Sequence, residues 1–375
     1  MLRFKTDEGI EFPNCKRMKM KDIFVEIIDK KHPTMPVLSV QQGMGTILRD
    51  KSNRNINYNK TMKKGDFIIH LRSFEGGLEC SNYDGISSPA YKILRTNKLI
   101  PEAYKGYFRT YNFIEGKLSA AVVGIRDGKN IDMPTFWEIE LNVPSLPEQQ
   151  KIAEFLSTVD RVIEKQKETI TTWKERKKGV MQKLFSQEVR FKANDGSEFP
   201  EWEEKKIDDI ATCFAGATPS TKIPEYWDNG TIQWMSSGEV NNGQIYETEK
   251  RISQLGFDKC STKMVKPNTV VMALAGQGKT RGMVAITRVP LCDDYLYQYL
   301  QTQYNNLRLI SSGDGTRGGL NLKLVGGYVV SMPCFIEQQK IVACLSALDD
   351  VIEKKKATLA AWEELKKGLL QQMFV

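Results

Sequence analysis

The strongest constraint in this chain is an internal repeat with a period of half its length. Residues 148–185 and 337–374 are identical at 21 of 38 aligned positions, at an offset of 189. The motif RFKTDEGIEFP at residues 3–13 recurs as RFKANDGSEFP at residues 190–200, at an offset of 187. Similarity at a fixed period marks a repeated structural unit. We therefore predict two copies of one unit, each with an opening motif, a domain of about 130 residues and a long tail.

The two tails have the spacing of amphipathic helices. Apolar or large residues recur at every seventh position from 152 to 180 and from 341 to 369, and a second stripe includes positions 156, 163, 345 and 352. This pattern is typical of a coiled-coil seam, in which Trp173 and Trp362 fall and polar Gln166 and Lys355 would fix the register. An apolar stripe needs a partner. The simplest is the other tail, in an antiparallel pair, and a generic dimerisation coiled coil is the alternative.

The first residues of the tails carry signals for helix starts. Ser145 is suited to cap the first helix, and Pro147 is tolerated in its first turn. Gly179 and Gly368, at matching positions, each cost about 1 kcal/mol relative to alanine, so they either permit a close approach or end the helix. Four glutamines near the helix starts are predicted to pack against a domain or a partner rather than DNA: Gln149, Gln150, Gln338 and Gln339.

Composition argues against several classes of protein. The 375 residues are 41% hydrophobic and 27% charged, as in a globular protein long enough for two domains. No apolar run predicts a membrane span, and residues 1–13 lack the core of a secretory signal. The seven cysteines form no C-x-x-C pair, which favours reduced thiols in the cytoplasm over disulfides or a zinc site. The formal charge of +8 is compatible with nucleic acid but does not establish it.

The regions between the repeated segments, residues 14–146 and 201–335, resemble each other only faintly. Apolar runs at residues 67–69, 270–273 and 282–287 predict short buried strands. Residues 104–113 and 295–304 are predicted to be helical and end near matching Thr110 and Thr302. Each region is therefore predicted to be a mixed α/β domain with glycine-rich loops. Different domains on matching connectors suggest two different targets held in one frame.

Three groups of loop residues are candidate DNA contacts. They are residues 71–77 with their counterpart 275–281, residues 124–130 with their counterpart 313–321, and the aromatic stretch 224–230 with Gln233 and Trp234. Arginine can read guanine, asparagine and glutamine can read adenine, and lysine neutralises phosphate. The alternative is that these are ordinary turns with solvated side chains. The residues that we assign to DNA are Arg72, Arg126, Lys129 and Asn130 in the first domain, and Gln277, Lys279, Arg281, Arg317 and Asn321 in the second.

No catalytic or metal site is predicted. Residues 273–280, ALAGQGKT, nearly fit the phosphate-binding pattern G-x-x-x-x-G-K-[ST], but Ala273 replaces the first glycine and a strand follows where a helix is required. The two histidines leave little material for His-based catalysis or metal ligation. No Ser/His/Asp arrangement can be assembled, and acidic pairs at residues 208–209 and 293–294 are most simply solvated.

These motifs resemble those of a known family. EQQKI at residues 148–152 and 337–341, the tryptophan and KKG that follow in each tail, and the loops at 72–77 and 316–321 resemble the specificity subunit of type I restriction–modification systems, over essentially the whole chain. The resemblance implies that each variable region is a target-recognition domain that reads one half of a bipartite DNA site. It implies long helices that pack antiparallel, space the two domains and dock two methyltransferase subunits, which restriction subunits then join. Residues 14–36, however, do not match the second domain's opening at 201–216, and the second domain is near neutral.

The resemblance also implies a non-catalytic chain without a cofactor of its own. S-adenosylmethionine, ATP and Mg²⁺ are expected in the partner subunits, because methyl transfer requires flipping an adenine into a pocket for which no motif occurs here. The predicted fold is mixed α/β (α+β) with a pseudo-twofold repeat: recognition domain 1 at residues 1–146, a long helix at 147–187, domain 2 at 188–335 and a second long helix at 336–375. A DNA-binding protein that works alone and a coiled-coil adaptor that binds proteins remain as alternatives.

Overall fold

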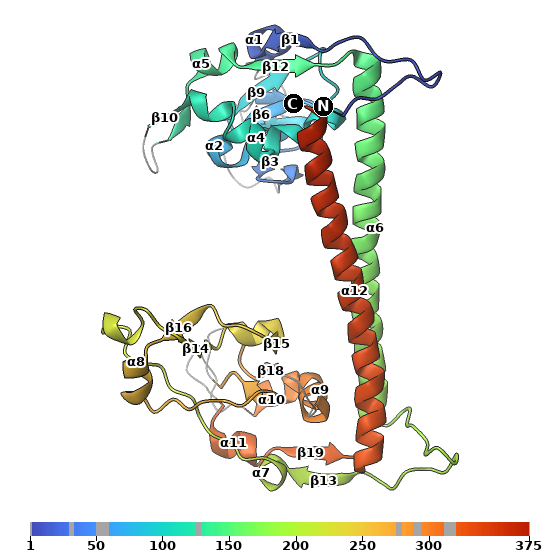
Figure 1. Cartoon of the computed structure of the whole chain (residues 1–375), viewed down its shortest axis with the longest axis vertical. Helices are drawn as coiled ribbons and strands as arrows, with labels where there is room; N and C mark the ends of the chain where they lie inside the picture. Colours follow the sequence, from blue (N-terminus) through green and yellow to red (C-terminus); the bar gives the residue numbers. More distant parts are fainter. Residues whose placement is uncertain are drawn as a thin grey trace. The chain divides into compact units, whose positions relative to one another are not determined.

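The computed structural model describes residues 2–29, 34–49, 60–124, 129–274, 280–287, 294–310 and 320–374. They form two compact units: unit 1 comprises Met1–Thr169 and Lys355–Val375, and unit 2 comprises Ile170–Lys354. Each unit is mixed α and β, and contains one variable domain with a part of each long helix, α6 (Leu146–Phe185) and α12 (Phe335–Met373) (Figure 1). Across the described ranges, the apolar stretches of the helices are too short to cross a bilayer.

Unit 1 is built from short strands and helical turns. Its largest sheet is antiparallel with the order β2–β9–β6–β7, and the pairs β1–β12, β3–β4, β5–β8 and β10–β11 are separate. The elements before α6 are β1 (Lys16–Lys19), α1 (Met20–Ile23), β2 (Val25–Ile27), β3 (Leu38–Gln41), β4 (Gly45–Leu48), β5 (Lys60–Met62), β6 (Phe67–Ile69), α2 (Ser73–Gly76), β7 (Glu79–Cys80), β8 (Gly85–Ser87), β9 (Lys92–Arg95), α3 (Pro101–Tyr104), η1 (Tyr107–Arg109), α4 (Tyr111–Ile114), η2 (Leu118–Ala121), β10 (Val122–Val123), β11 (Asn130–Ile131), α5 (Met133–Glu138) and β12 (Glu140–Val143).

The core of unit 1 is rich in aromatic rings. The rings of Phe67 and Phe108 meet edge to face with centroids 5.0 Å apart, a geometry that aromatic quadrupoles favour, and both side chains are fully buried. The strand predicted at 67–69 is confirmed as β6. The helix predicted at 104–113 is instead three short turns, because Thr110 has extended backbone and its Oγ1 caps α4 by accepting from Phe113 N.

Unit 2 has a different set of strands. Its three-stranded sheet has the order β15–β18–β17, with β15 and β18 parallel, and two further pairs are β13–β19 and β14–β16. The strand predictions at 270–273 and 282–287 are confirmed as β17 and β18, and the helix predicted at 295–304 as α9. The elements between α6 and α12 are β13 (Glu203–Lys206), α7 (Ile207–Ile210), η4 (Pro224–Tyr226), β14 (Ile232–Trp234), η5 (Glu239–Asn242), β15 (Gln244–Ile245), β16 (Lys250–Ile252), α8 (Gln254–Asp258), β17 (Val270–Met272), β18 (Val284–Thr287), α9 (Asp294–Thr302), α10 (Tyr304–Leu309), α11 (Leu322–Gly326) and β19 (Val329–Met332).

Both units open on the same strand pairing. In unit 1, β1 pairs antiparallel with β12, and in unit 2, β13 pairs antiparallel with β19. Each opening strand runs into one helical turn, and the turn begins with an equivalent bond: Met20 N donates to Ile139 O at 2.8 Å, and Ile207 N to Tyr328 O at 3.0 Å. Unit 1 forms this opening although residues 14–36 do not match 201–216, because backbone pairing needs little sequence identity.

An arginine from each opening motif binds a buried glutamate at the start of a long helix. Arg3 Nε and Nη2 donate to the two carboxylate oxygens of Glu148 at 2.6 and 2.7 Å, and Arg190 donates to those of Glu337 at 3.1 and 2.9 Å. The glutamates are 1% and 0% exposed. Each arginine also donates to the carbonyl of the closing proline of its motif. These forked pairs fasten the opening motifs to the helix starts.

The end of each long helix packs against aromatic rings of a variable domain. In unit 1 the ring of Phe374 lies 4.7 Å from Tyr104 and 4.8 Å from Tyr107. In unit 2 the ring of Phe185 lies 5.7 Å from Tyr295 and 5.5 Å from Tyr299. Each domain is therefore held between the start of the helix that follows it in sequence and the end of the other one.

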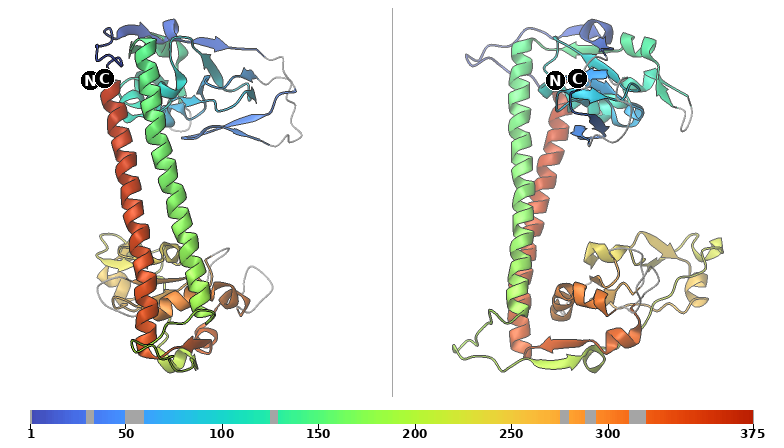
Figure 2. Two further views of the ribbon diagram at one scale, coloured as in Figure 1. Left: turned by 90° about the vertical axis from the view of Figure 1, so that its right-hand side faces the viewer. Right: turned by 180° about the vertical axis from the view of Figure 1, so that it is seen from behind.

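Opposite charges pair between the helices in both units. In unit 1, Lys366 binds Asp160 at 2.5 Å and Glu363 binds Lys167 at 3.2 Å, so the numbers fall on α12 as they rise on α6 and the segments are antiparallel. The start of α6 and the end of α12 lie side by side in both views of Figure 2. In unit 2, Lys177 binds Asp349 at 2.8 Å. Gly179 and Gly368 do not end their helices, and nothing in the described structure lies within 4 Å of an added Cβ at either position.

The start of α6 differs from its prediction in one detail. Ser145 does not cap the helix through its side chain: its Oγ is buried without a hydrogen-bond partner among the described residues. Pro147, in the first turn, has no N–H to donate. Gln149 instead ties the helix to the domain, with Nε2 donating to Lys98 O and Pro144 O at 3.0 and 2.9 Å and Oε1 accepting from Ile100 N at 2.8 Å. Its predicted role in domain–helix packing is confirmed.

Candidate nucleic-acid interface

The loop at residues 71–77 presents its side chains from a fixed turn in unit 1. It follows the buried strand β6 and contains α2. Ser73 is fully buried, and its Oγ accepts from His70 N at 2.8 Å. Gly77 has φ +74°, and an added Cβ would lie 1.9 Å from Phe108 O, so only glycine fits there. The turn leaves Arg72 exposed and Leu71 73% exposed.

The second predicted loop of unit 1 contacts the first. Lys129 Nζ lies 5.6 Å from the centre of the Phe74 ring, within the range of a cation–π interaction. Lys129 and Asn130 are exposed at the start of β11, whereas Arg126 lies outside the described residues. The chain thus brings two candidate groups together from positions more than 50 residues apart. Arg72 and Lys129 contribute two positive charges to this surface.

The matching loops of unit 2 are also joined. Leu320 N donates to Leu274 O at 3.1 Å, which links the end of one candidate loop to the beginning of the other. Gly282, with φ +80°, donates to Ala273 O at 2.9 Å and closes the loop between β17 and β18. Arg281 is half-buried beside it. The candidates Gln277, Lys279 and Arg317 lie outside the described residues.

Two of the candidate asparagines have structural hydrogen bonds. Asn321 Oδ1 accepts from Leu324 N at 3.0 Å and caps α11, and Asn130 Oδ1 accepts from Ile131 N at 2.8 Å. A bidentate contact to adenine uses both the oxygen and the amide of an asparagine. In this conformation the Nδ2 amino group of each asparagine can donate to a base, whereas Oδ1 already accepts from a backbone N–H.

The aromatic stretch of the second domain forms a brace. The rings of Trp227 and Trp234 meet edge to face at 5.2 Å. Their Nε1 groups donate to Ser220 O and Ala217 O, both at 3.1 Å. Lys250 Nζ lies 5.8 Å from the Trp227 ring. The tryptophans therefore hold the segment at 217–230 against the β14–β16 pair.

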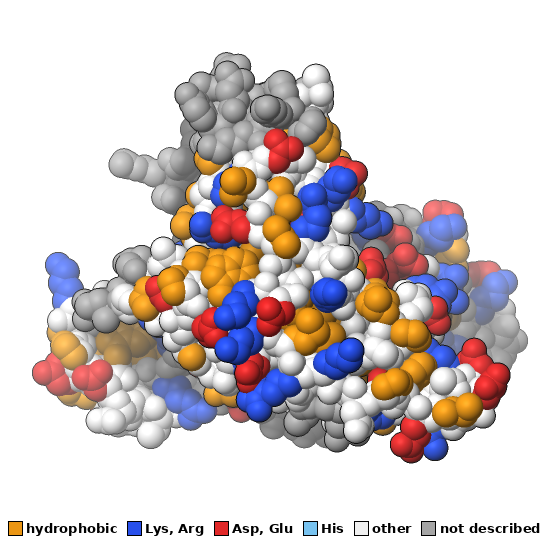
Figure 3. Space-filling view, turned by 90° about the horizontal axis from the view of Figure 1, so that it is seen from above, with side chains coloured by type: hydrophobic (Ala, Val, Ile, Leu, Met, Phe, Trp, Pro, Cys, Tyr) orange, Lys and Arg blue, Asp and Glu red, His pale blue; other side chains and the backbone are white. Residues whose placement is uncertain are grey.

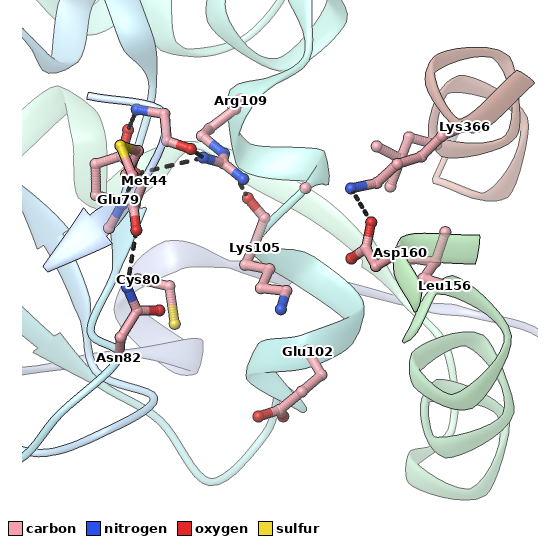
Figure 4. A pocket seen from close by; sticks show the side chains of 14 residues that line it. Met44, Glu79, Cys80, Asn82, Glu102, Lys105, Arg109, Leu156, Asp160 and Lys366 are labelled. Atoms are coloured by element: carbon pink, nitrogen blue, oxygen red, sulfur yellow. Dashed lines mark hydrogen bonds and ion pairs between the residues drawn. The ribbon is translucent and has the colours of Figure 1, made fainter. Parts of the chain in front are cut away.

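A buried carboxylate sets the turn between β3 and β4 in unit 1. Glu79, 1% exposed, accepts from Gly43 N and Gly45 N at 2.6 and 3.0 Å and lies 3.6 Å from Arg109. This turn borders a cavity of about 150 Å³ that also reaches Asp160 and Lys366 on the long helices (Figure 4). Four of the charged side chains drawn there form two ion pairs, Glu79–Arg109 and Asp160–Lys366. Within the described ranges, no group of three potential ligands could hold a metal ion.

Burial keeps two titratable groups of unit 1 neutral. Burial raises the pKa of Cys80 to about 12, so its thiol stays protonated and a poor nucleophile at neutral pH. Burial also lowers the pKa of His70. Because His70 Nδ1 accepts from Arg72 N at 3.2 Å, the neutral ring carries its proton on Nε2. The imidazole therefore shapes the Arg72 loop and does not add charge to it.

Charge of one sign does not cover the visible surface. On the face of the molecule shown in Figure 3, Lys and Arg side chains lie among Asp and Glu side chains. The net charge therefore says less about DNA binding than the arrangement of particular side chains does.

The repeated glutamines are divided among several roles. Gln149 joins α6 to its domain, and Gln338 Nε2 donates to Pro333 O at 2.8 Å at the start of α12. Gln150 is exposed and donates to Glu154 Oε1 at 2.9 Å, and Gln339 is exposed. Sequence reasoning missed the pairing of Arg3 with Glu148. The motifs RFK and EQQK both recur, at nearly equal offsets, and this joint recurrence could have indicated that the arginine of one pairs with the glutamate of the other.

Comparison with known proteins defines the class of this chain. Residues 14–172 and 200–361 match the type I restriction modification DNA specificity domain. The MjaIX specificity subunit of Methanocaldococcus jannaschii is 30% identical over 51% of this chain and 48% of its own length. The MjaVIII specificity subunit of the same organism is 23% identical over 98% of this chain and 94% of its own. A solved structure from work on assembly and conformational transition of the type I R-M system has a TM-score of 0.55 at 16% identity, over 96% of this chain and 98% of that one.

These matches define a class of proteins that carry DNA specificity domains and have a non-catalytic role in DNA recognition. Because the specificity-domain matches cover far more than half of the sequence, the chain belongs to the type I restriction–modification DNA specificity family. In such a system the specificity subunit recognises the DNA sequence and does not perform the chemistry. The alignment spans about half the length of the MjaIX relative and nearly all of the MjaVIII relative.

Proposed function

We propose that this chain reads a bipartite DNA site, one half with residues 1–146 and the other with residues 188–335. The observation that carries the proposal is that both units repeat one frame, while the loops on that frame differ. The opening strand pair and the Arg–Glu pair occur in each unit with equivalent partners. Two dissimilar readers on one repeated frame suit two half-sites of different sequence.

The long helices at residues 147–187 and 336–375 are proposed to set the spacing of the half-sites as one antiparallel coiled coil with pseudo-twofold symmetry. Support comes from ion pairs between α6 and α12 in each unit, such as Asp160–Lys366 and Lys177–Asp349. Recognition modules commonly lie about 34 Å, one DNA turn, apart or at multiples of it. Lengthening both helices by one turn should change the unread spacer and leave the half-sites unchanged.

The DNA contacts are proposed to lie on the paired loops of each unit. The convergence of the candidate loops supports this assignment: Lys129 lies over Phe74 in unit 1, and Leu320 bonds Leu274 in unit 2. The proposed contact residues are Arg72, Arg126, Lys129 and Asn130 for one half-site, and Gln277, Lys279, Arg281, Arg317 and Asn321 for the other.

The partners follow from membership in the family. We infer that the chain docks two methyltransferase subunits, which restriction subunits then join, in the cytoplasm. S-adenosylmethionine, ATP and Mg²⁺ are assigned to those partners, in keeping with the non-catalytic role of a specificity subunit. The target adenine would be flipped into a pocket of the methyltransferase.

Adenine-methylation mapping tests this function directly. Genomic DNA from cells that carry the gene and its methyltransferase is compared with DNA from cells that lack this gene alone. We expect one bipartite motif to disappear while the methyltransferase is still present, which identifies the chain as the reader and yields both half-sites. An unchanged methylation pattern would contradict the proposal. A helix-lengthened variant serves as the second arm, with the spacer as its readout.

A further inference from the structure

The second domain contains a two-stranded ribbon whose first strand carries Gln233, a candidate DNA contact from the sequence, and whose second strand has no assigned role. Strands β14 and β16 pair antiparallel, with Gln233 directly opposite Arg251 between two flanking pairs. Side chains alternate between the two faces of a strand. Ile252, in one flanking pair, is 1% exposed, whereas Gln233 and Arg251 are both exposed. The middle pair therefore faces outward from the ribbon, whose place in the domain is seen in Figure 1.

The ribbon is held firmly from behind. Trp234, on β14, is fixed by its ring contact with Trp227 and by its bond to Ala217 O. A Cβ added to Gly230 would lie 2.6 Å from the carbonyl carbon of Arg251, so the preceding loop packs directly on the backbone of β16. A pre-ordered backbone loses little entropy when its side chains bind a ligand. Gln233 and Arg251 therefore stand on an ordered backbone, which lowers the entropy cost of a specific contact.

Among the described residues, the outward pair has no polar partner. Within the part of unit 2 that the structure describes, no hydrogen bond or ion pair holds the side chain of Gln233 or Arg251. The neighbouring Lys250 is instead placed at the Trp227 ring, 5.8 Å from its centre. The guanidinium and the carboxamide therefore keep their complete sets of donors and acceptors for a ligand.

The ribbon is continuous with a loop already proposed to bind DNA. Met235, the residue after β14, packs in one hydrophobic cluster with Ala273 and Met283. Ala273 precedes and Met283 follows the loop that carries Gln277, Lys279 and Arg281. The two features share a packed base, so a DNA duplex placed at the loop has the end of β14 close by.

We propose that Gln233 and Arg251 contact base edges in the half-site that unit 2 reads, an inference that rests on the proposed function. A two-stranded ribbon fits the major groove, which is about 12 Å wide. Directly opposed residues have Cβ atoms about 4.5–5.5 Å apart, and base pairs rise by about 3.4 Å, so the pair reaches one base pair or two adjacent ones. Arginine suits guanine O6 and N7, and glutamine suits adenine N6 and N7. The half-site therefore contains a guanine and an adenine on adjacent base pairs.

Base preference in variants of the full chain, assembled with its methyltransferase, tests the assignment. The variants are Arg251→Ala, Arg251→Lys and Gln233→Ala, measured by competitive binding to libraries with one randomised half-site, at two salt concentrations. Arg251→Ala should lower the preference for guanine at one position by roughly 5- to 150-fold. Arg251→Lys should lose most of the same preference, because lysine lacks the fork. Gln233→Ala should lower the preference for adenine at a neighbouring base pair.

The matched control is Lys205→Ala on β13, which removes one exposed charge whose partner is Glu203. Lys205→Ala should leave every base preference unchanged. All of the variants should leave the base preferences at the other half-site, which unit 1 reads, unchanged. Unchanged preferences in Arg251→Ala and Gln233→Ala would overturn the assignment. So would uniform weakening across all sequences, with a salt slope reduced by about 0.9 and rescue by Arg251→Lys, since that marks a phosphate contact. A wild-type chain without any bipartite preference would overturn the proposed function itself, and with it this assignment.

Discussion

Replacing Arg3 with alanine would leave Glu148 buried without its counter-charge. Glu148 is 1% exposed and Arg3 is 28% exposed, and the two hydrogen bonds that Glu148 loses are 2.6 and 2.7 Å long. The bonds from Arg3 to Phe12 O and Pro13 O are lost as well. Removing one partner of a buried ion pair costs about 3–5 kcal/mol. Because Arg3 is partly exposed, water can reach the vacated carboxylate, and we expect a smaller cost of about 2–3 kcal/mol in unit 1.

Hydrogen exchange read by mass spectrometry localises this cost. A loss of about 2–3 kcal/mol corresponds to roughly 30- to 150-fold faster exchange at the start of α6, where opening controls the rate. The start of α12 in unit 2 should be unaffected and serves as the internal control. Arg190→Ala should show the reverse pattern with a smaller effect, because Arg190 forks onto Glu337 as Arg3 does onto Glu148, and Trp202 Nε1 also donates to Glu337 at 3.1 Å.

A second substitution separates charge from packing. Glu148→Gln removes the buried charge at nearly constant shape, so it should cost less than Arg3→Ala. Adding it to Arg3→Ala should recover most of the loss, because a neutral amide is cheaper to bury than a carboxylate. The reasoning is refuted if Glu148→Gln alone costs as much as Arg3→Ala, or if Arg3→Ala changes exchange less than about threefold.

Three further predictions follow from the fold. A circular permutant that joins residue 374 to residue 2 and opens the chain at residues 186–188 should fold and keep both half-sites, because Leu2 N bonds Gln372 O at 2.8 Å as Val189 N bonds Lys183 O at 3.2 Å. Loss of folded structure in circular dichroism would contradict this. Gly77→Ala should destabilise unit 1 by at least about 1 kcal/mol, because Gly77 has a positive φ and an added Cβ would clash with Phe108 O. Gly179→Ala should stabilise its helix by up to about 1 kcal/mol. Urea midpoints of both variants equal to that of the wild-type chain would refute both expectations. Burial in the folded chain lowers the pKa of His70, so folding favours the neutral ring. Its contribution to the free energy of unfolding is therefore present above about pH 6.5 and is lost as the pH falls through the lowered pKa. His70→Asn should remove that part of the acid sensitivity of the urea midpoint, and an unchanged pH dependence would show that the ring does not contribute.

The sequence determined the parts of this protein that depend on local periodicity. The seven-residue spacing predicted both long helices, and α6 and α12 begin near the predicted positions. Short β-branched runs predicted β6, β17 and β18. These signals lie within one segment, because helix and strand each place apolar residues on one face at a fixed step. The repeat likewise showed that the frame is built twice.

Which distant residues meet depends on how the chain packs in three dimensions. Arg3 and Glu148 are 145 positions apart, and Lys177 and Asp349 are 172 apart, so no local pattern pairs them. The helix predicted at residues 104–113 is three turns because the backbone is extended at Thr110, while its ring side chains pack on β6 and the end of α12. The outward pairing of Gln233 with Arg251 depends on strand register, which a single residue of slip would reverse. Register and charge pairing are properties of the packed chain, whereas periodicity is a property of each segment alone.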